Sequence, residues 1–157
     1  MKIVVVSDNH GRMECLREIP QLHRDADAFI HCGDSELPAE ALQGYVSVRG
    51  NNDFAFELPD MKVLELQGQR IMIVHGHRHL YMGQPDMLIS KARRQGCGLV
   101  FYGHTHVFSW IRADGIHLIN PGSLSHNRDG SDPSYAVVTL EGNDVSVQRI
   151  NWNPQKR

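Results

Sequence analysis

The sequence predicts an α/β fold in which two packed β-sheets are flanked by helices. In the first half of the 157-residue chain, short apolar runs alternate with segments of helical periodicity. From residue 107 onward, strand patterns follow one another and are joined by turn sequences. Alternation followed by consecutive strands is typical of two sheets covered by helices. We therefore expect a single domain over residues 1–157.

Three strands are expected in the first half, and each ends in a polar turn. Residues 2–6 form a β-branched run that is typical of a strand buried on both faces, and residues 12–22 have helical spacing. Residues 28–32 and 45–49 are the next predicted strands, and residues 38–42 are predicted as a short helix. In α/β sheets, sites form where such strands end.

The remaining elements are bounded by glycine and proline signals. The predicted strands 61–66 and 70–74 are joined by the turn Gln67-Gly68-Gln69. A helix should begin near Pro85 and end at Gly96, and a strand should follow over residues 99–102. The two predicted antiparallel hairpins join residues 107–112 to 116–119 around Asp114-Gly115, and residues 135–140 to 145–150.

Composition excludes several classes of protein. A net charge of −2 provides no basic field for duplex nucleic acid or for a membrane surface. Cys15, Cys32 and Cys97 contain no Cys-x-x-Cys pair, so we interpret them as small apolar residues in a reducing compartment. No apolar stretch is long enough for a signal or membrane segment. We expect a cytoplasmic protein.

The stretch Phe101-Tyr102-Gly103-His104-Thr105-His106 is central to the functional interpretation. It places two histidines directly after an apolar strand, and neutral imidazole is a common ligand of transition metals. Gly103 should let the backbone turn sharply before the pair. Taken alone, such a pair is more often two surface or core histidines than a metal site.

Four further strand ends carry similar polar clusters with glycine. The potential ligands are Asp8, His10, Asp34, Asn51, His75, His104 and His106. Oxygen donors mixed with imidazoles suit manganese, iron, zinc or nickel better than calcium or magnesium. Seven ligands exceed the coordination sphere of one transition ion but suit two ions that share a carboxylate. Helix capping or turn formation is the alternative role for Asp8, Asp34 and His106.

The motifs Asp-x-His-Gly, Gly-Asp, Gly-Asn-x-Asp, His-Gly-His and Gly-His-Thr-His, in this order, resemble those of the calcineurin-like metallophosphoesterases. The short chain, the Asn120-Pro121-Gly122-Ser123 turn and the all-β ending resemble the small YfcE-type phosphodiesterase branch. The resemblance runs from Lys2 to about Ile150. It implies the metallo-dependent phosphatase-like fold, a four-layer αββα sandwich of two mixed sheets flanked by helices.

The resemblance also implies a role for each ligand. Asp8, His10 and His106 would bind the first ion, Asp34 would bridge both ions, and Asn51, His75 and His104 would bind the second. A water or hydroxide between the two ions would be the nucleophile. We therefore expect a binuclear metal-dependent phosphodiesterase, with manganese favoured and iron, zinc or nickel as alternatives. Two divalent ions outweigh two aspartates and a hydroxide, which leaves positive charge facing the phosphate.

Asn52 departs from the broader family, in which many members have a histidine that protonates the leaving group. Asparagine can bind phosphate but cannot act as a general acid. We predict that His77 replaces the missing acid or that the substrates have good leaving groups; a structural role for His77 is weighted equally. Arg49 is a second predicted phosphate contact, although it can simply end its strand. We interpret His23, His31, His79, His117 and His126 as structural or surface residues.

A scaffold or binding protein on the same fold is the alternative to an enzyme, as in the retromer subunit that resembles this family. Loss of ligands would favour a scaffold, whereas all seven positions here carry a competent donor. We expect a small phosphate ester as substrate, with no stable binding to nucleic acid or membrane. The sequence encodes no particular substrate and leaves homo-oligomer formation open.

Overall fold

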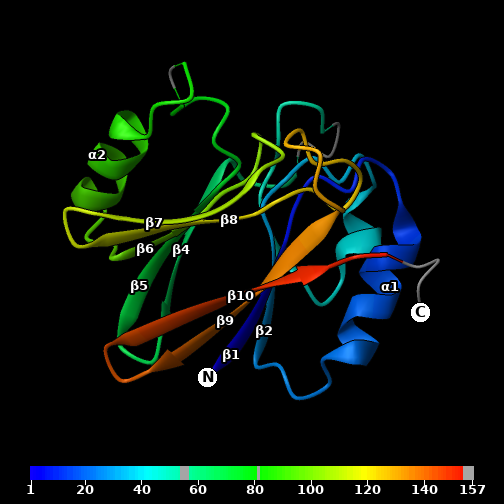
Figure 1. Cartoon of the computed structure of the whole chain (residues 1–157), viewed down its shortest axis with the longest axis horizontal. Helices are drawn as coiled ribbons and strands as arrows, with labels where there is room; N and C mark the ends of the chain where they lie inside the picture. The colour runs from blue at the N-terminus through cyan, green and yellow to red at the C-terminus, as the bar shows by residue number, and fades with distance from the viewer. Residues whose placement is uncertain (54–56, 81, 154–157) are drawn as a thin grey trace.

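Two mixed five-stranded sheets pack face to face in the computed structural model, which describes residues 1–53, 57–80 and 82–153. Helix α1 (Met13–Leu22) lies on the outer side of one sheet, and helix α2 (Asp86–Arg94) lies on the outer side of the other (Figure 1). This arrangement confirms the predicted αββα sandwich.

The first sheet has the order β10-β9-β1-β2-β3. Its strands are β1 (Lys2–Val6), β2 (Ala28–His31), β3 (Val46–Ser47), β9 (Ser134–Glu141) and β10 (Asp144–Asn151). β1, β2 and β3 are parallel, whereas β9 pairs antiparallel with both β1 and β10. β3 is shorter than the predicted strand 45–49, and the predicted helix 38–42 is a 3₁₀ turn over Ala39–Leu42.

The second sheet has the order β4-β5-β6-β8-β7. Its strands are β4 (Met61–Leu66), β5 (Gln69–Val74), β6 (Leu99–Phe101), β7 (Phe108–Ala113) and β8 (Ile116–Pro121). Both predicted hairpins form, but β8 also runs parallel to β6, so the second half of the chain is not purely antiparallel. Gln69 begins β5 instead of belonging to the turn, because Gln67 and Gly68 alone supply the two positive φ angles of a tight hairpin.

Strand β1 is buried on both faces, as predicted. Ile3 and Val5 lie in the core between the sheets, whereas Val4 packs with Ile19 of α1. A third apolar cluster places Leu88 of α2 against the second sheet. Burial of each such aliphatic side chain stabilises the fold by about 1.5–3 kcal/mol. The three cysteines are free and buried, in agreement with their interpretation as apolar residues.

Helix α2 begins next to Pro85 and ends before Gly96, as predicted. Asp86 lies in the first turn, and Lys91, Arg93 and Arg94 lie in the last turns, where each sign of charge complements the helix dipole. Gly96 then adopts a φ of +70°. None of the described helices is long and apolar enough to cross a membrane.

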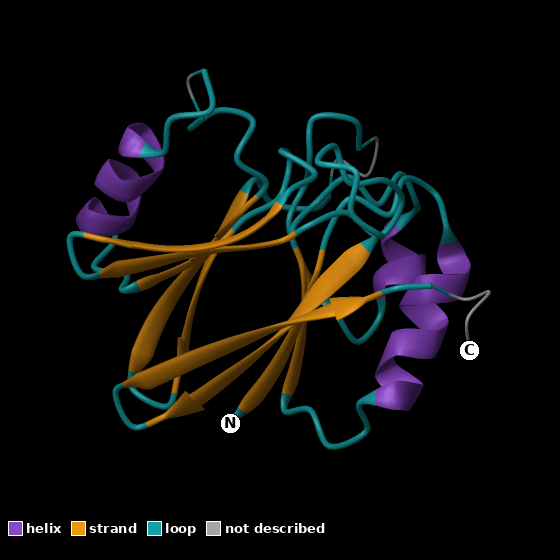
Figure 2. Cartoon of the chain, in the orientation of Figure 1, coloured by secondary structure: helices purple, strands orange, loops and turns teal. Residues whose placement is uncertain are grey.

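The loops that leave β1, β2, β5 and β6 lie at one edge of the sandwich (Figure 2). The parallel pairing of β1 with β2 and of β5 with β6 places the carboxyl ends of each pair on the same side of its sheet. The polar clusters predicted at strand ends therefore meet across the two sheets.

Candidate metal centre

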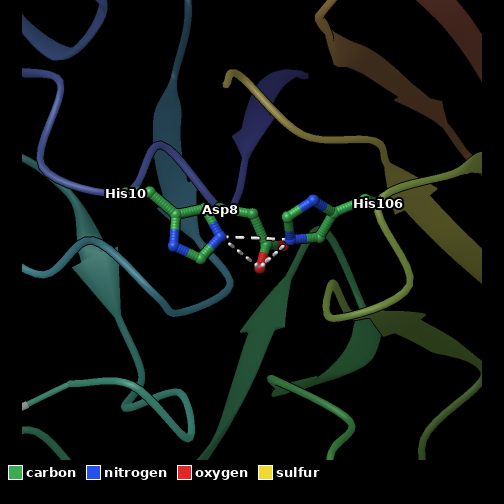
Figure 3. Close-up of side chains that lie close together, drawn as sticks. All are labelled: Asp8, His10 and His106. Atoms are coloured by element: carbon green, nitrogen blue, oxygen red, sulfur yellow. Dashed lines mark hydrogen bonds and ion pairs between the residues drawn. The ribbon is translucent and has the colours of Figure 1, made fainter. Parts of the chain in front are cut away.

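The converging loops bring predicted ligands from all parts of the sequence into two adjoining groups. One group contains Asp8, His10 and His106 (Figure 3), and the other contains Asp8, Asp34 and His75. The ligand atoms within each group lie within 4.8 Å of one another, a spacing that could hold a metal ion. Asp8 belongs to both groups, so two sites would adjoin at one carboxylate.

In the first group, three potential donor atoms face a common point. His10 Nε2 and His106 Nε2 lie 3.1 Å apart, and Asp8 Oδ1 lies 3.3 Å from His106 Nε2. His106 Nδ1 lies 2.9 Å from the carbonyl oxygen of His126. Because a carbonyl oxygen only accepts hydrogen bonds, Nδ1 carries the hydrogen and Nε2 of the neutral ring presents its lone pair. Glu36 Oε1, 3.3 Å from His10 Nδ1, favours the same tautomer of His10.

The second group is similarly arranged and more deeply buried. His75 Nδ1 lies 2.8 Å from the carbonyl oxygen of Cys32, so Nε2 faces Asp34 Oδ2 at 3.3 Å. His75 Nε2 and Asp8 Oδ1 are buried and make no hydrogen bond within the described residues. Buried polar atoms normally have partners because leaving them unpaired is costly. A divalent ion would satisfy both atoms, so the donor set fits a transition metal.

The two carboxylates are held in the charged form that binds metal. Burial alone would raise the pKa of Asp34, but this effect is outweighed by the adjacent imidazole of His75 and by hydrogen bonds from Asn52. Burial likewise acts to raise the pKa of Asp8, and His106, His75 and Ser7 together lower it below its usual value. Both groups therefore remain ionised at neutral pH.

The backbone at the predicted ligands adopts conformations that are uncommon for residues other than glycine. Five of the nine described non-glycine residues with positive φ are Asp8, His10, Asp34, His104 and His106, at 44° to 73°. Such conformations cost about 1–3 kcal/mol each and persist where the surrounding structure requires them. Ordinary helix capping does not require this strain, so the backbone favours the metal role over the alternative for Asp8, Asp34 and His106.

Gly103 serves a different purpose from the predicted sharp turn. Its φ is not among the positive values, which fall instead at His104 and His106. A Cβ atom at Gly103 would collide with Ser7 Oγ and lie 2.6 Å from Asp8 Oδ2. Glycine is therefore needed here for the close approach of the segment after β6 to Ser7 and Asp8.

His104 and Asn51 flank the two groups. The centroid of the His104 ring is 5.1 Å from that of His75, and the His104 backbone N–H donates to Asp8 Oδ2. Asn51 is exposed, and no side-chain hydrogen bond of Asn51 is found within the described residues. Their assignment to the second ion and the bridging role of Asp34 remain predictions.

The three predicted substrate-contacting residues differ in their surroundings. Asn52 donates to Asp34 through its backbone N–H, at 2.9 Å, and its side-chain amide, at 3.0 Å. Burial lowers the pKa of His77, and His75 adds to this effect; its role as a general acid remains a prediction. Arg49 forms an ion pair with Asp60 at 2.9 Å, so its charge is partly engaged before a substrate binds.

Comparison with known proteins identifies the family. Residues 1–143 match the calcineurin-like phosphoesterase superfamily domain. A probable metallophosphoesterase of Bacillus subtilis, YsnB, is 36% identical over 154 residues, which cover 94% of this chain and 89% of that protein. The chain belongs to the calcineurin-like phosphoesterase superfamily.

Solved structures agree with this assignment. A predicted phosphoesterase from Streptococcus pneumoniae has a TM-score of 0.90 and 31% identity, and the match covers 96% of this chain and 88% of that one. An archaeal phosphodiesterase matches with a TM-score of 0.76 and 22% identity over 96% of this chain and 100% of that one. At this lower identity, the second likeness shows the fold alone.

Asp53 is a residue of this phosphoesterase centre whose role the sequence does not reveal. Its buried carboxylate accepts hydrogen bonds from the backbone N–H groups of Asp34, Glu36 and Gly50, at 2.9, 2.8 and 2.7 Å. It thereby joins the loop after β2 to the loop after β3. Its place in the Gly-Asn-x-Asp motif was the only signal in the sequence.

His31 performs a similar function between β1 and β2 of the phosphoesterase fold. It accepts a hydrogen bond from the Gly33 N–H at Nδ1, so Nε2 carries the hydrogen and donates to Asn9 Oδ1 at 2.8 Å. Burial lowers its pKa to about 4, which keeps the ring neutral. Ser123 Oγ donates to the carbonyl oxygen of Asp8 at 2.7 Å, so the Asn120-Pro121-Gly122-Ser123 turn lies against the loop that follows β1.

Proposed function

We propose that this phosphoesterase is a phosphodiesterase that uses two divalent transition ions, with manganese favoured and iron, zinc or nickel as alternatives. The observation that carries the proposal is that Asp8 is common to two adjoining ligand groups. One transition ion cannot use all the donors gathered there, whereas paired ions are suited to phosphate esters. The archaeal phosphodiesterase with the same fold is consistent with a diester substrate.

The predicted ligands would be assigned to the two ions as follows. Asp8, His10 and His106 would hold one ion. His75, His104 and Asn51 would hold the other, and Asp34 would bridge the two. When bound, the ions supply positive charge to the phosphate and acidify an attacking water. Asn52 and Asp53 hold the side chain and backbone of Asp34, which reduces rearrangement when metal binds.

A small phosphate ester is the proposed substrate, and the cytoplasm is the proposed location. The net charge of −2 supports neither a nucleic-acid surface nor a membrane surface. The electrostatic attraction for a phosphate would then come from the ions and the few cations around them.

Hydrolysis by the manganese-loaded protein tests the function. We expect bis(4-nitrophenyl) phosphate to be hydrolysed faster than 4-nitrophenyl phosphate, and a panel of cyclic and linear nucleotide diesters to identify better substrates. Asp8→Asn should abolish turnover. His117→Ala is the matched control and should retain it, because His117 stacks on Trp110 away from the ligand groups. Full metal occupancy without turnover of any ester would instead support the scaffold alternative.

A further inference from the structure

A pocket of about 280 Å³ adjoins the metal centre on the side of His75. It lies beside the loop that follows β5, and α2 contributes one wall through Lys91. His75 and His77 line this pocket, and His75 also belongs to the second ligand group. The pocket and the candidate metal centre therefore share a wall, so one substrate could occupy both.

The charges around the pocket are predominantly positive. Arg78 and Lys91 line it together with one carboxylate, Asp60. That carboxylate is already engaged, because Arg49 lies 2.9 Å from Asp60 Oδ1 and Arg78 lies 3.2 Å from Asp60 Oδ2. Two cations of the pocket wall, Arg78 and Lys91, together with the neighbouring Arg49 therefore outnumber the single carboxylate of Asp60.

Lys91 is the cation in this pocket whose charge is not neutralised. The half-buried Lys91 has no ion-pair or hydrogen-bond partner for its ammonium group within the described residues. The positive charge also acts on His79, which lines the same pocket. Burial lowers the pKa of His79, and Lys91, Arg78 and Arg94 lower it further. A lysine ammonium is a compact charge that commonly binds phosphate.

The volume of the pocket limits the size of its occupant. Pockets for drug-sized ligands are usually about 300–1,000 Å³, so a pocket at the lower limit suits one compact group. We propose that this pocket binds a second phosphate group on one arm of the substrate, and that Lys91 and Arg78 select diesters carrying it. This inference rests on the proposed phosphodiesterase function and specifies its substrate class.

Two nucleotide diesters that differ by one phosphate test the proposal. Thymidine 5′-(4-nitrophenyl phosphate) and its 3′-phosphorylated form have the same leaving group. The wild-type protein, loaded with manganese, should show a kcat/KM at least about fivefold higher for the phosphorylated ester, in line with a charged hydrogen bond. Lys91→Gln should remove most of this preference, whereas Arg93→Gln should keep it.

Arg93 is the matched control because it lies on the same helix and loses the same charge, yet it pairs with Asp114 outside the pocket. Thermal unfolding establishes that both variants are folded. Equal kcat/KM values for the two esters in the wild type, or an equal loss of preference in the two variants, would overturn the proposal while the phosphodiesterase function stands.

Nucleotide binding tests the pocket proposal separately from the proposed phosphodiesterase activity. If neither ester is hydrolysed, calorimetry on the manganese-loaded protein compares thymidine 3′,5′-bisphosphate with thymidine 5′-monophosphate. Tighter binding of the bisphosphate, lost only in Lys91→Gln, would support the pocket even though hydrolysis had failed. Equal binding of the two nucleotides would overturn the pocket as well.

Discussion

The Nε2 atoms of His10 and His106 lie 3.1 Å apart, with Asp8 Oδ1 beside them. The Nδ1 atom of His106 faces a carbonyl oxygen, and that of His10 faces Glu36, so the tautomers of both rings direct lone pairs towards each other. Two lone pairs repel at this distance unless a cation or proton lies between them. The pair is therefore arranged for a shared positive partner.

Metal removal should destabilise the fold. An ion present at 100 times its Kd contributes about 2.7 kcal/mol, so chelation should lower Tm by roughly 5–10 °C for each ion in a domain of this size. Elemental analysis of the loaded protein should find two ions per chain. His106→Ala should bind fewer ions and respond less to the chelator, and His117→Ala should behave as wild type. A single ion at saturating metal would contradict the binuclear arrangement.

Asp34→Asn should weaken both ions, because the resemblance assigns Asp34 as the bridging ligand. His106→Ala should mainly weaken the first ion. Asp8→Asn provides the comparison, since Asp8 is the carboxylate common to the two ligand groups. Calorimetric metal titrations of the three variants identify which carboxylate is shared. Full occupancy and activity in Asp34→Asn would show that its assignment is wrong.

Asn52→His should make activity less sensitive to the leaving group. General acid catalysis contributes about 10²–10⁴-fold, and its benefit is largest for poor leaving groups. The wild type should cleave aryl diesters readily and alkyl monoesters poorly, and the variant should narrow this gap. A series of esters of graded leaving-group pKa measures how strongly the rate of hydrolysis depends on the leaving group.

Asn52→Ala is the control for this substitution, because it also loses the side-chain hydrogen bond to Asp34 without adding an acid. If the rate depends equally on leaving-group pKa in wild type and Asn52→His, position 52 is not the acid position or His77 already supplies the proton. A steeper dependence of the rate on leaving-group pKa in His77→Ala would identify His77 as that acid.

His31→Gln should reduce the loss of folding stability that occurs as the pH falls below about 6.5. Burial lowers the pKa of His31 from 6.5 to about 4, although Asp53 and Asp8 act in the opposite direction. The stabilisation from a neutral ring is fully present above about pH 6.5 and is lost as the pH falls towards 4, by up to about 3 kcal/mol. Denaturant unfolding at several pH values measures this loss, which should be smaller in the variant. An unchanged pH dependence would exclude His31 as its source.

Local patterns in the sequence predicted most elements of the fold. The β-branched run of residues 2–6, the glycine turns of the hairpins and the capping signals of α2 each act over a few residues, so a single sequence reveals them. The strand-end clusters of aspartate and histidine also appear locally. Their chemistry could therefore be predicted before their positions were known.

The pairing of distant segments had no such local signal. The placement of β9 beside β1, the run of β8 parallel to β6 and the shortened β3 depend on how complete surfaces pack. The support that Asp53 and His31 give to the ligand loops also depends on hydrogen bonds between separate strand ends.

The sequence by itself determined the α/β class, the order of the elements and the donor types gathered at the strand ends, because these depend on residue identity and short-range geometry. Only the tertiary structure decided that Asp8 is common to both ligand groups, that Asn52 holds Asp34, and that Lys91 of α2 reaches a pocket walled by His75. These relationships join residues far apart in the chain. Their distances are set by the packing of two sheets and two helices, which no single segment encodes.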